Sequence, residues 1–404
     1  MKTRRGLSFS EMDLSEERRV FKRRKSRAAA AAGGGGGGGE ERSSGRKKPK
    51  LSTDDVGKVD YFDSLPDDIV LSILSKLSSN ADCPADFITV LITCKRLNGL
   101  GFNPLVLSAA SRKMLAVKAQ NWSESAHRFL KLCADAGNFE ACYILGMIRF
   151  YCYRNRGSGA SFMAKAAIKS HAPALYSLAV MQFNGSGGSK TDKDLRAGVA
   201  LCARAASVGH VDALRELGHC FQDGYGVKRN VPEGRRFLVQ ANVREVANVL
   251  ATTPAAVLHG GSWVAWNPLQ HHMGGGTSCP LLSDFGCNVP SPEPHPANKF
   301  LTDWFTAKGG VPGPGLRLCS NAGCGRPELR RHEFRRCSVC GSVNYCSRAC
   351  QAMHWRSVHK SECVPAERWP DAALEIPAAQ EPAANVMVNG NGEEIGIENG
   401  MAPM

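Results

Sequence analysis

The sequence predicts a mainly α-helical protein made of several separate parts, with disordered segments at both ends. Three observations lead to this prediction. Apolar residues recur at helical spacing within 60–105, a helical repeat follows within 120–250, and Cys and His residues crowd into 317–363. The 404 residues leave room for more than one domain, since a typical domain takes roughly 100 to 200 residues. The 42 Gly and 21 Pro indicate that much of the chain lies outside any core.

The cysteines are expected to be reduced, because nothing directs the chain out of the cell. No run of 18 or more apolar residues without charges occurs, and no apolar stretch follows the basic amino terminus. We therefore expect no membrane span, no signal peptide, and a location in the nucleus and/or cytoplasm. In a reducing compartment, clustered Cys more often bind metal than form disulfides. Seven of the sixteen Cys lie between Cys319 and Cys363.

Half of the net charge of +14 comes from the amino-terminal arm. Residues 1–60 hold 16 Lys or Arg against 9 Asp or Glu. Residues 1–58 are predicted to be disordered, because two basic blocks (Lys22–Arg27 and Arg46–Lys50) flank runs of Ala and Gly. Such blocks suit nuclear targeting and a merely solubilising tail equally. The middle of the chain is less basic than the whole, so direct nucleic-acid binding is not expected.

Residues 60–105 predict two short amphipathic helices. Ser64 suits a helix cap, Pro66 the first helical position, and Asp67 and Asp68 the positive end of the helix dipole. The first apolar stripe is Ile69, Val70, Ile73, Leu74 and Leu77, and the second is Phe87, Val90, Leu91, Cys94 and Leu97. A segment this small builds little core of its own, so it needs a partner or another domain.

The order of these residues resembles an F-box. The resemblance rests on Leu65-Pro66-Asp67-Asp68-Ile69, then Ile73-Leu74, then Cys94-Lys95-Arg96-Leu97. It implies that the Leu-Pro helix docks on a Skp-type adaptor of a cullin-RING ubiquitin ligase. An ordinary helical hairpin that packs on the following repeats is the alternative.

A repeat of about 36 residues follows between residues 120 and 250. Its units contain Ala141-x3-Leu145-Gly146, Ala174-x3-Leu178-Ala179 and Ala213-x3-Leu217-Gly218. Gly137, Ser170 or Gly209 stands four residues ahead of each first Ala, where a turn between helices is expected. Small pairs lie upstream, and Gly-x-Gly follows the second and third units.

These units resemble the Sel-like branch of the tetratricopeptide family, whose helical hairpins stack into a solenoid. The first unit departs from the pattern, with Cys152 and Arg154 where the other units have glycines, as terminal repeats often do. A solenoid can present a concave surface to peptides or serve as a rigid spacer.

Residues 251–312 are predicted to be a Gly/Pro-rich linker. Trp263, Trp266 and His271-His272 lie in it, and the paired His lack further ligands at metal spacing. Residues 298–307 are predicted to form a short helix on the repeats. The acidic segment 364–404 is predicted to be a disordered tail.

The strongest signal is a set of eight potential metal ligands. They are Cys319, Cys324, Cys337, Cys340, Cys346, Cys350, His359 and Cys363. Seven thiolates and one imidazole suit two closed, tetrahedral, structural Zn²⁺ sites. Cys337-x2-Cys340 with Gly341 fits a tight knuckle, whereas Cys346 with Cys350 and His359 with Cys363 have the spacing of one helix face. Spacing alone leaves open whether the four close pairs combine in chain order or interleave.

The same order resembles a MYND finger, through Tyr345-Cys346-Ser347, Cys350-Gln351, His354-Trp355 and His359-x3-Cys363. The resemblance implies interleaved, cross-braced sites. Cys319, Cys324, Cys346 and Cys350 would hold one ion, and Cys337, Cys340, His359 and Cys363 the other. Cys324 and His359 depart from the usual spacing, and His354 is the alternative ligand.

Together the three resemblances point to a plant F-box protein with Sel-like repeats and a carboxy-terminal MYND finger. They imply a non-catalytic substrate adaptor that binds a Skp-type adaptor and cullin through the F-box. The repeats or the finger would take an unidentified protein substrate or a Pro-containing peptide. A nuclear transcriptional cofactor or scaffold, unconnected with ubiquitination, is the alternative. A MYND-containing methyltransferase is not favoured, since no segment outside the finger has that family's catalytic motifs.

Overall fold

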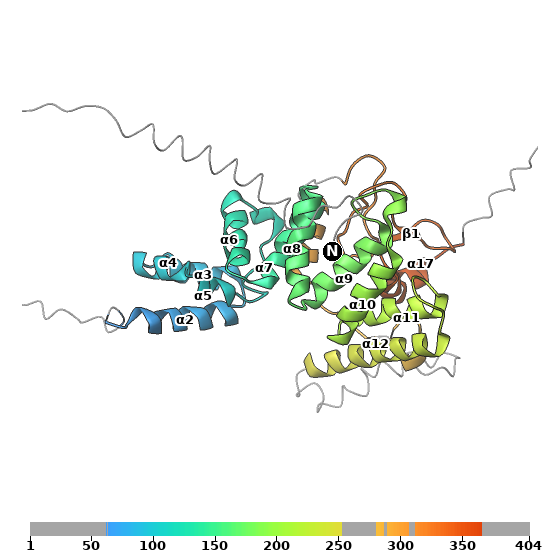
Figure 1. Ribbon diagram of the computed structural model, residues 1–404, viewed down its shortest axis with the longest axis horizontal. Coiled ribbons are helices and arrows are strands. Elements are labelled where there is room, and N and C mark those ends of the chain that lie inside the picture. Colours follow the sequence, from blue (N-terminus) through green and yellow to red (C-terminus); the bar gives the residue numbers. More distant parts are fainter. Residues whose placement is uncertain (1–61, 63, 253–279, 287–288, 307–311, 366–404) are drawn as a thin grey trace, which may run out of the picture. The chain divides into compact units, whose positions relative to one another are not determined.

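The computed structural model describes residues 62, 64–252, 280–286, 289–306 and 312–365 (Figure 1). Helices dominate these residues, and the sheet found among them has two short strands. None of the described helices has the length and apolarity needed to cross a membrane. The predicted disordered arm, nearly all of the predicted tail, and Trp263, Trp266 and His271-His272 lie outside the described residues.

The F-box-like segment forms four helices. They are α2 (Asp67–Asn80), α3 (Pro84–Leu91), α4 (Lys95–Gly101) and α5 (Pro104–Ser108). Pro66 is the cap residue of α2 and no side chain caps that helix, so the expected cap at Ser64 and the expected helical position of Pro66 are both wrong. Asp67 and Asp68 do lie in the first turn, as predicted.

The second expected helix is divided in two by a break at residues 92–94. Cys94 has an extended backbone, and its Sγ accepts a hydrogen bond from the Leu97 amide at 3.4 Å, which starts α4. The Thr93 hydroxyl donates to the Val90 carbonyl at 2.7 Å, which closes the end of α3. The single stripe predicted from Phe87 to Leu97 is therefore wrong. Local hydrogen bonds from short polar side chains compete with the continuing helix here.

The repeats form three helical hairpins and a longer closing helix. The hairpins are α6 (Glu124–Asp135) with α7 (Phe139–Met147), α8 (Arg156–Ile168) with α9 (Ala172–Asn184), and α10 (Leu195–Ser207) with α11 (Val211–Asp223), and the closing helix is α12 (Val231–Thr252). Each helix packs on the next in the chain, which is the stacking of a solenoid (Figure 1).

The predicted turns and close helix approaches are confirmed. Gly137, Ser170 and Gly209 all have positive φ, which suits the turn inside each hairpin. A Cβ atom on Gly146 would lie 3.0 Å from the carbonyl oxygen of Gly159, so α7 and α8 leave no room there for a side chain. The irregular first unit ends in a π-helical turn, η2 (Ile148–Cys152), and Arg154 has the positive φ that glycine has in the next unit.

Parts of the predicted linker pack on the repeats. The short helix expected at 298–307 is confirmed as α15 (Pro296–Thr306), which contacts η1 (Ala119–Asn121), α7 and η2. The buried Phe300 ring lies edge-on to Trp122, with centroids 5.1 Å apart. A second short element, η4 (Pro280–Leu282), contacts α12.

Asn138 ties the F-box-like helices to the first repeat. Its buried side-chain amide donates to the carbonyls of Leu107, Ser108 and Ala110, at the end of α5, over 2.8 to 3.2 Å. Its Oδ1 accepts from the Ala141 amide at 2.9 Å, which caps α7. The Asn138 side chain therefore joins the F-box-like helices to the first repeat.

We expect Asn138→Ala to lower the free energy of unfolding by about 2 to 3 kcal/mol, since it removes a helix cap and leaves buried carbonyls without a donor. Urea unfolding followed by circular dichroism measures this, with Ser79→Ala on exposed α2 surface as the control. Equal midpoints for Asn138→Ala and the wild type would contradict the tie.

Candidate metal centre and its contact with the repeats

The Cys-rich segment folds around two groups of ligand-type side chains. Its elements are β1 (Arg335–Arg336), β2 (Asn344–Tyr345), α16 (Arg348–His354), η5 (Trp355–His359) and α17 (Lys360–Glu362). β1 and β2 pair antiparallel, with Arg335 opposite Tyr345. Gly341 has a φ of 65° and its amide donates to the Cys337 carbonyl at 3.0 Å, so the predicted knuckle is present.

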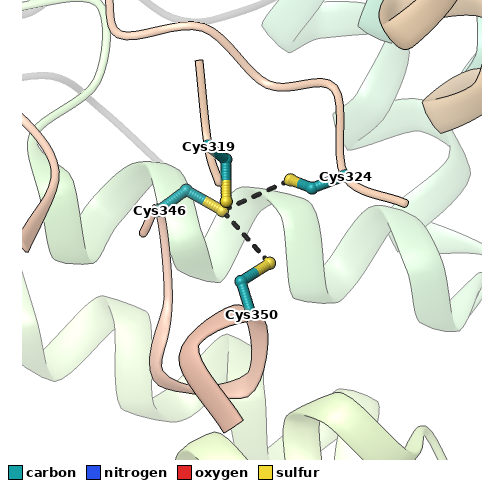
Figure 2. A group of neighbouring side chains, drawn as sticks. All are labelled: Cys319, Cys324, Cys346 and Cys350. Atoms are coloured by element: carbon teal, nitrogen blue, oxygen red, sulfur yellow. Dashed lines mark hydrogen bonds between the residues drawn. The ribbon is translucent and has the colours of Figure 1, made fainter. Parts of the chain in front are cut away.

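The first group contains only cysteines, and all four are buried (Figure 2). The Sγ atoms of Cys324 and Cys346 are 3.5 Å apart, and those of Cys346 and Cys350 are 3.6 Å apart. The fourth member is Cys319. Cys350 lies on α16 but Cys346 precedes that helix, so the expected common helix face is wrong for this pair.

The second group is more open to solvent. It joins Cys337, Cys340, His359 and Cys363. The Cys340 Sγ lies 3.5 Å from His359 Nε2, and the Sγ atoms of Cys337 and Cys363 are 3.9 Å apart. His354, the alternative ligand, instead places its Nδ1 2.9 Å from the Tyr345 hydroxyl.

Both groups fit a tetrahedral zinc ion. Zn–S bonds of about 2.3 Å place the sulfurs of one tetrahedron about 3.8 Å apart, close to the spacings found here. Within each group all ligand atoms lie within 4.8 Å of one another. The two groups take alternate close pairs along the chain, which is the interleaved division that the MYND resemblance implies.

A third group, Glu140 with His171 and His295, also has the composition of a metal site, and it joins two repeats to the segment before α15. The Ala297 amide donates to His295 Nδ1 at 3.1 Å, and His295 Nε2 lies 2.5 Å from a Glu140 oxygen without forming a hydrogen bond to it. Burial opposes the charge of Glu140, but the hydrogen bond from His171 and the close contact with His295 outweigh it and lower the pKa of this carboxyl. These contacts hold His295 against the first and second repeats.

Arg326 connects the all-cysteine group to the second repeat. Its buried guanidinium donates to the Ser177 hydroxyl on α9 at 2.7 Å and lies 3.6 and 3.9 Å from the sulfurs of Cys324 and Cys346. A buried cation beside thiolates offsets part of the charge that a four-thiolate site carries. The Tyr176 hydroxyl, also on α9, donates to the Ser347 hydroxyl at 3.0 Å.

Glu216 on α11 connects the same group to the third repeat. Its carboxylate accepts from the backbone amides of Arg348 and Ala349, at 2.8 and 3.2 Å, at the start of α16. This is the helix that carries Cys350. Burial raises the pKa of Glu216 overall, although the charge of Arg335, the two amides and the charge of Arg348 favour its ionised form. Negative charge at a helix start is favourable, so the repeat supplies what the finger's own sequence lacks there.

A third polar contact joins the end of the finger to α12. Glu245 accepts from Arg215 on α11 at 2.8 Å and from Arg356 of the finger at 2.7 Å, with all three side chains buried. The amide of Asn242 holds residues 281 and 283 beside this cluster through their carbonyls. The finger and the repeats therefore share a buried polar interface.

The F-box-like helices leave apolar side chains exposed. Val70 and Leu74 of the predicted stripe are buried, whereas Ile69 and Ile73 are each 45% exposed. On and beside α3, Ile88 and Ile92 are 48% and 74% exposed. Arg96 fixes the Leu-Pro entry to α2, since its guanidinium bonds to the Leu65 carbonyl and to Asp67 at 2.8 Å.

Sequence reasoning did not find Arg326, Ser177 or Glu216. A usable signal was present, because Ser177 and Glu216 occupy the same position of the Ala-x3-Leu unit, where the first unit has Ile144. A polar or charged residue at a position with buried neighbours on both sides indicates a polar partner.

We expect Arg326→Met to destabilise the protein by about 3 kcal/mol, because it removes one partner from a buried charged contact. Thermal unfolding and limited proteolysis between the repeats and the finger report the change. Arg331→Met, at an exposed position of the finger, is the matched control. Equal proteolysis of the two variants would exclude Arg326 as a connection between the parts.

Comparison with known proteins agrees with this division of the chain. A model of plant tetratrico peptide repeats matches residues 112–196, a Sel1 repeat model matches 211–241, and a MYND finger model matches 319–363. A solved Sel1 repeat protein from Oxalobacter formigenes is 19% identical, covering 49% of this chain and 76% of its own, with a TM-score of 0.32. The assignment of the repeats rests on the family models.

Two curated relatives match nearly the whole chain. An F-box protein of Arabidopsis thaliana is 66% identical over 341 residues, which are 83% of this chain and 88% of that protein. A second F-box protein of Arabidopsis thaliana is 57% identical over 348 residues, which are 86% of this chain and 98% of that protein. This chain therefore belongs to the same family as these plant F-box proteins, with Sel1-type repeats and a MYND finger.

Proposed function

We propose that the chain is the substrate-recognition adaptor of a Skp-cullin-F-box ubiquitin ligase. The observation that supports this most directly is the exposed pair Ile69 and Ile73 on α2, with Ile88 and Ile92 at α3. Full burial of one such side chain is worth roughly 1.5 to 3 kcal/mol, so four together suffice to hold a partner. Arg96 presents the Leu-Pro entry to that partner in a fixed conformation.

In this proposal the chain performs no bond chemistry. A partner enzyme makes the isopeptide bond, and the adaptor contributes the proximity of the substrate. The F-box binds the Skp-type adaptor and, through it, the cullin. The repeats and the finger offer the surfaces for a protein substrate or a Pro-containing peptide. We place this activity inside the cell, in the nucleus and/or the cytoplasm, consistent with the basic blocks Lys22–Arg27 and Arg46–Lys50.

We also propose that the finger holds two structural Zn²⁺ ions. Cys319, Cys324, Cys346 and Cys350 bind one, and Cys337, Cys340, His359 and Cys363 bind the other. Four protein ligands close each site, so no open coordination position remains for a reacting water. The zinc ions stabilise the fold of the finger. Through Cys350 they also stabilise α16, whose first backbone amides donate to Glu216.

The adaptor proposal predicts that Ile69→Asp with Ile73→Asp weakens binding to a Skp-type adaptor at least about 100-fold, because two buried contacts become buried charges. Calorimetric titration of the purified full chain with the adaptor measures this. Ile168→Asp with Val208→Asp, two other exposed apolar positions on the repeats, is the matched control. These exposed sites report binding more cleanly than Leu65, which is half-buried.

If the wild type does not bind the adaptor at all, the ligase proposal fails. The chain is then better explained as a MYND-finger scaffold or transcriptional cofactor in the nucleus. If the control variant loses binding equally, the effect comes from charge in general and the α2 surface is not the docking site.

The zinc proposal predicts two zinc ions per chain by elemental analysis. Cys346→Ser, in the buried group beside the repeats, removes one ion and exposes the finger to protease. Cys340→Ser, in the more open group, removes one ion with less change at the repeats, because no hydrogen bond or ion pair among the described residues joins that group to α9 or α11. One zinc per wild-type chain would contradict the two-ion assignment.

A further inference from the structure

A shallow pocket of about 380 Å³ lies where the turn after α11 meets the start of α10. Leu195 and Arg196 line it from α10, and Gly224, Gly226, Val227 and Lys228 line it from the turn. Gly224 and Gly226 have φ values of 70° and 75°, and a Cβ atom on Gly226 would lie 2.6 Å from the Leu195 carbonyl oxygen. The turn thus requires glycine and leaves backbone at the pocket wall.

The corresponding position one repeat earlier is closed by an arginine. There Arg156, the first residue of α8, donates to the carbonyl of Gly187 in the following turn at 2.9 Å. Leu195, the first residue of α10, occupies the equivalent position, and its apolar side chain cannot donate a hydrogen bond to the following turn. The pocket beside the third repeat therefore stays open, whereas the Arg156 side chain fills the equivalent space one repeat earlier.

The lining side chains with charge are both cationic. No hydrogen bond or ion pair engages the side chain of Arg196 or Lys228 among the described residues, and both are exposed. Within the same part of the chain, the backbone amides of Gly226, Val227 and Lys228 have no acceptor. The residues that line the pocket thus include two side-chain cations and three backbone amides without a protein acceptor in the part of the chain that the structure describes.

Neighbouring carboxylates are already engaged elsewhere. Asp194 accepts from the Ala197 amide at 2.9 Å, and Asp223 forms an ion pair with Arg348 of the finger. Just before the pocket, Lys193 lies among like charges, and burial together with Arg330 lowers its pKa. These carboxylates keep their charge, but residues 190–196 and 223–229 together hold five Lys or Arg against three Asp, so the local surface is net positive.

We propose that this pocket binds a phosphorylated serine or threonine side chain of a partner protein, which would be the ligase substrate if the proposed function holds. A phosphate carries a charge of about −1.5 to −2 and three acceptor oxygens, which matches two unpaired cations and a row of amides. A carboxylate offers one charge and two oxygens, so it satisfies this set less completely. Arginine's planar fork suits phosphate oxygens, and lysine adds a point charge.

Fluorescence-anisotropy binding of the full chain to three peptide pools tests the proposal. The pools share random flanking residues and differ only at the centre, which is phosphoserine, serine or glutamate. We expect the phosphoserine pool to bind at least about tenfold more tightly than the other two. Arg196→Gln with Lys228→Gln should remove that preference. Lys118→Gln with Lys169→Gln, which deletes the same two charges at exposed sites elsewhere on the repeats, should retain it.

Several outcomes would overturn the proposal. Equal binding of the phosphoserine and glutamate pools would assign the pocket to acidic peptides in general. If both double variants lost the phosphoserine preference equally, long-range charge attraction alone would explain the binding. Mixed-sequence RNA that binds with the same dependence on Arg196 and Lys228 would assign the pocket to nucleic acid. Adaptor binding, measured on the same Arg196→Gln with Lys228→Gln protein, separates failure of this pocket from failure of the ligase proposal.

Discussion

The structure depends most on the buried polar contact between Glu216 and the start of α16. A carboxylate without water is costly unless donors surround it, and the finger provides two backbone amides for this purpose. The amides in turn belong to the helix that carries Cys350. Loss of the Glu216 carboxylate would leave the two amides buried without an acceptor, and loss of the amides would leave the carboxylate buried without a donor. An unpaired buried group costs more free energy than a contact that never formed. Repeats and finger are therefore mutually dependent parts.

Mutual dependence bears on the role of the two ligand groups that we propose to hold zinc. A MYND-like module of about 45 residues builds little apolar core, so metal must supply much of its stability. Here the all-cysteine group also lies against α9 through Arg326 and Ser177. In the zinc proposal, binding of metal by the finger therefore also sets the position of side chains that contact the repeats. The more open second group has no such neighbour among the described contacts, so the two sites differ in role although their ligands are similar.

Much of this architecture could be predicted from sequence because its signals are local. Helical periodicity and turn glycines specify each hairpin, and the ligand types identify the metal centre without any partner. Prediction failed where short-range bonds compete, as at Cys94, where a side-chain sulfur starts a new helix. It also failed at the interface. Ser177 and Glu216 are one repeat apart, but the partners they meet lie 149 and 132 residues further along the chain. No local pattern specifies pairing at such distances.

The two kinds of surface on this chain differ in chemistry for a physical reason. Contacts that persist for the life of the fold can be buried and charged, because folding brings all the partners together at once and satisfies each donor. A surface that must exist both free and bound cannot carry unpaired buried charge, and exposed isoleucines tolerate water at small cost. In the proposed function, Ile69 and Ile73 form a surface of this second kind, whereas the buried contact of Arg215 with Glu245 is of the first kind. The position of exposed apolar residues is thus a better guide to exchangeable partners than the position of buried ion pairs.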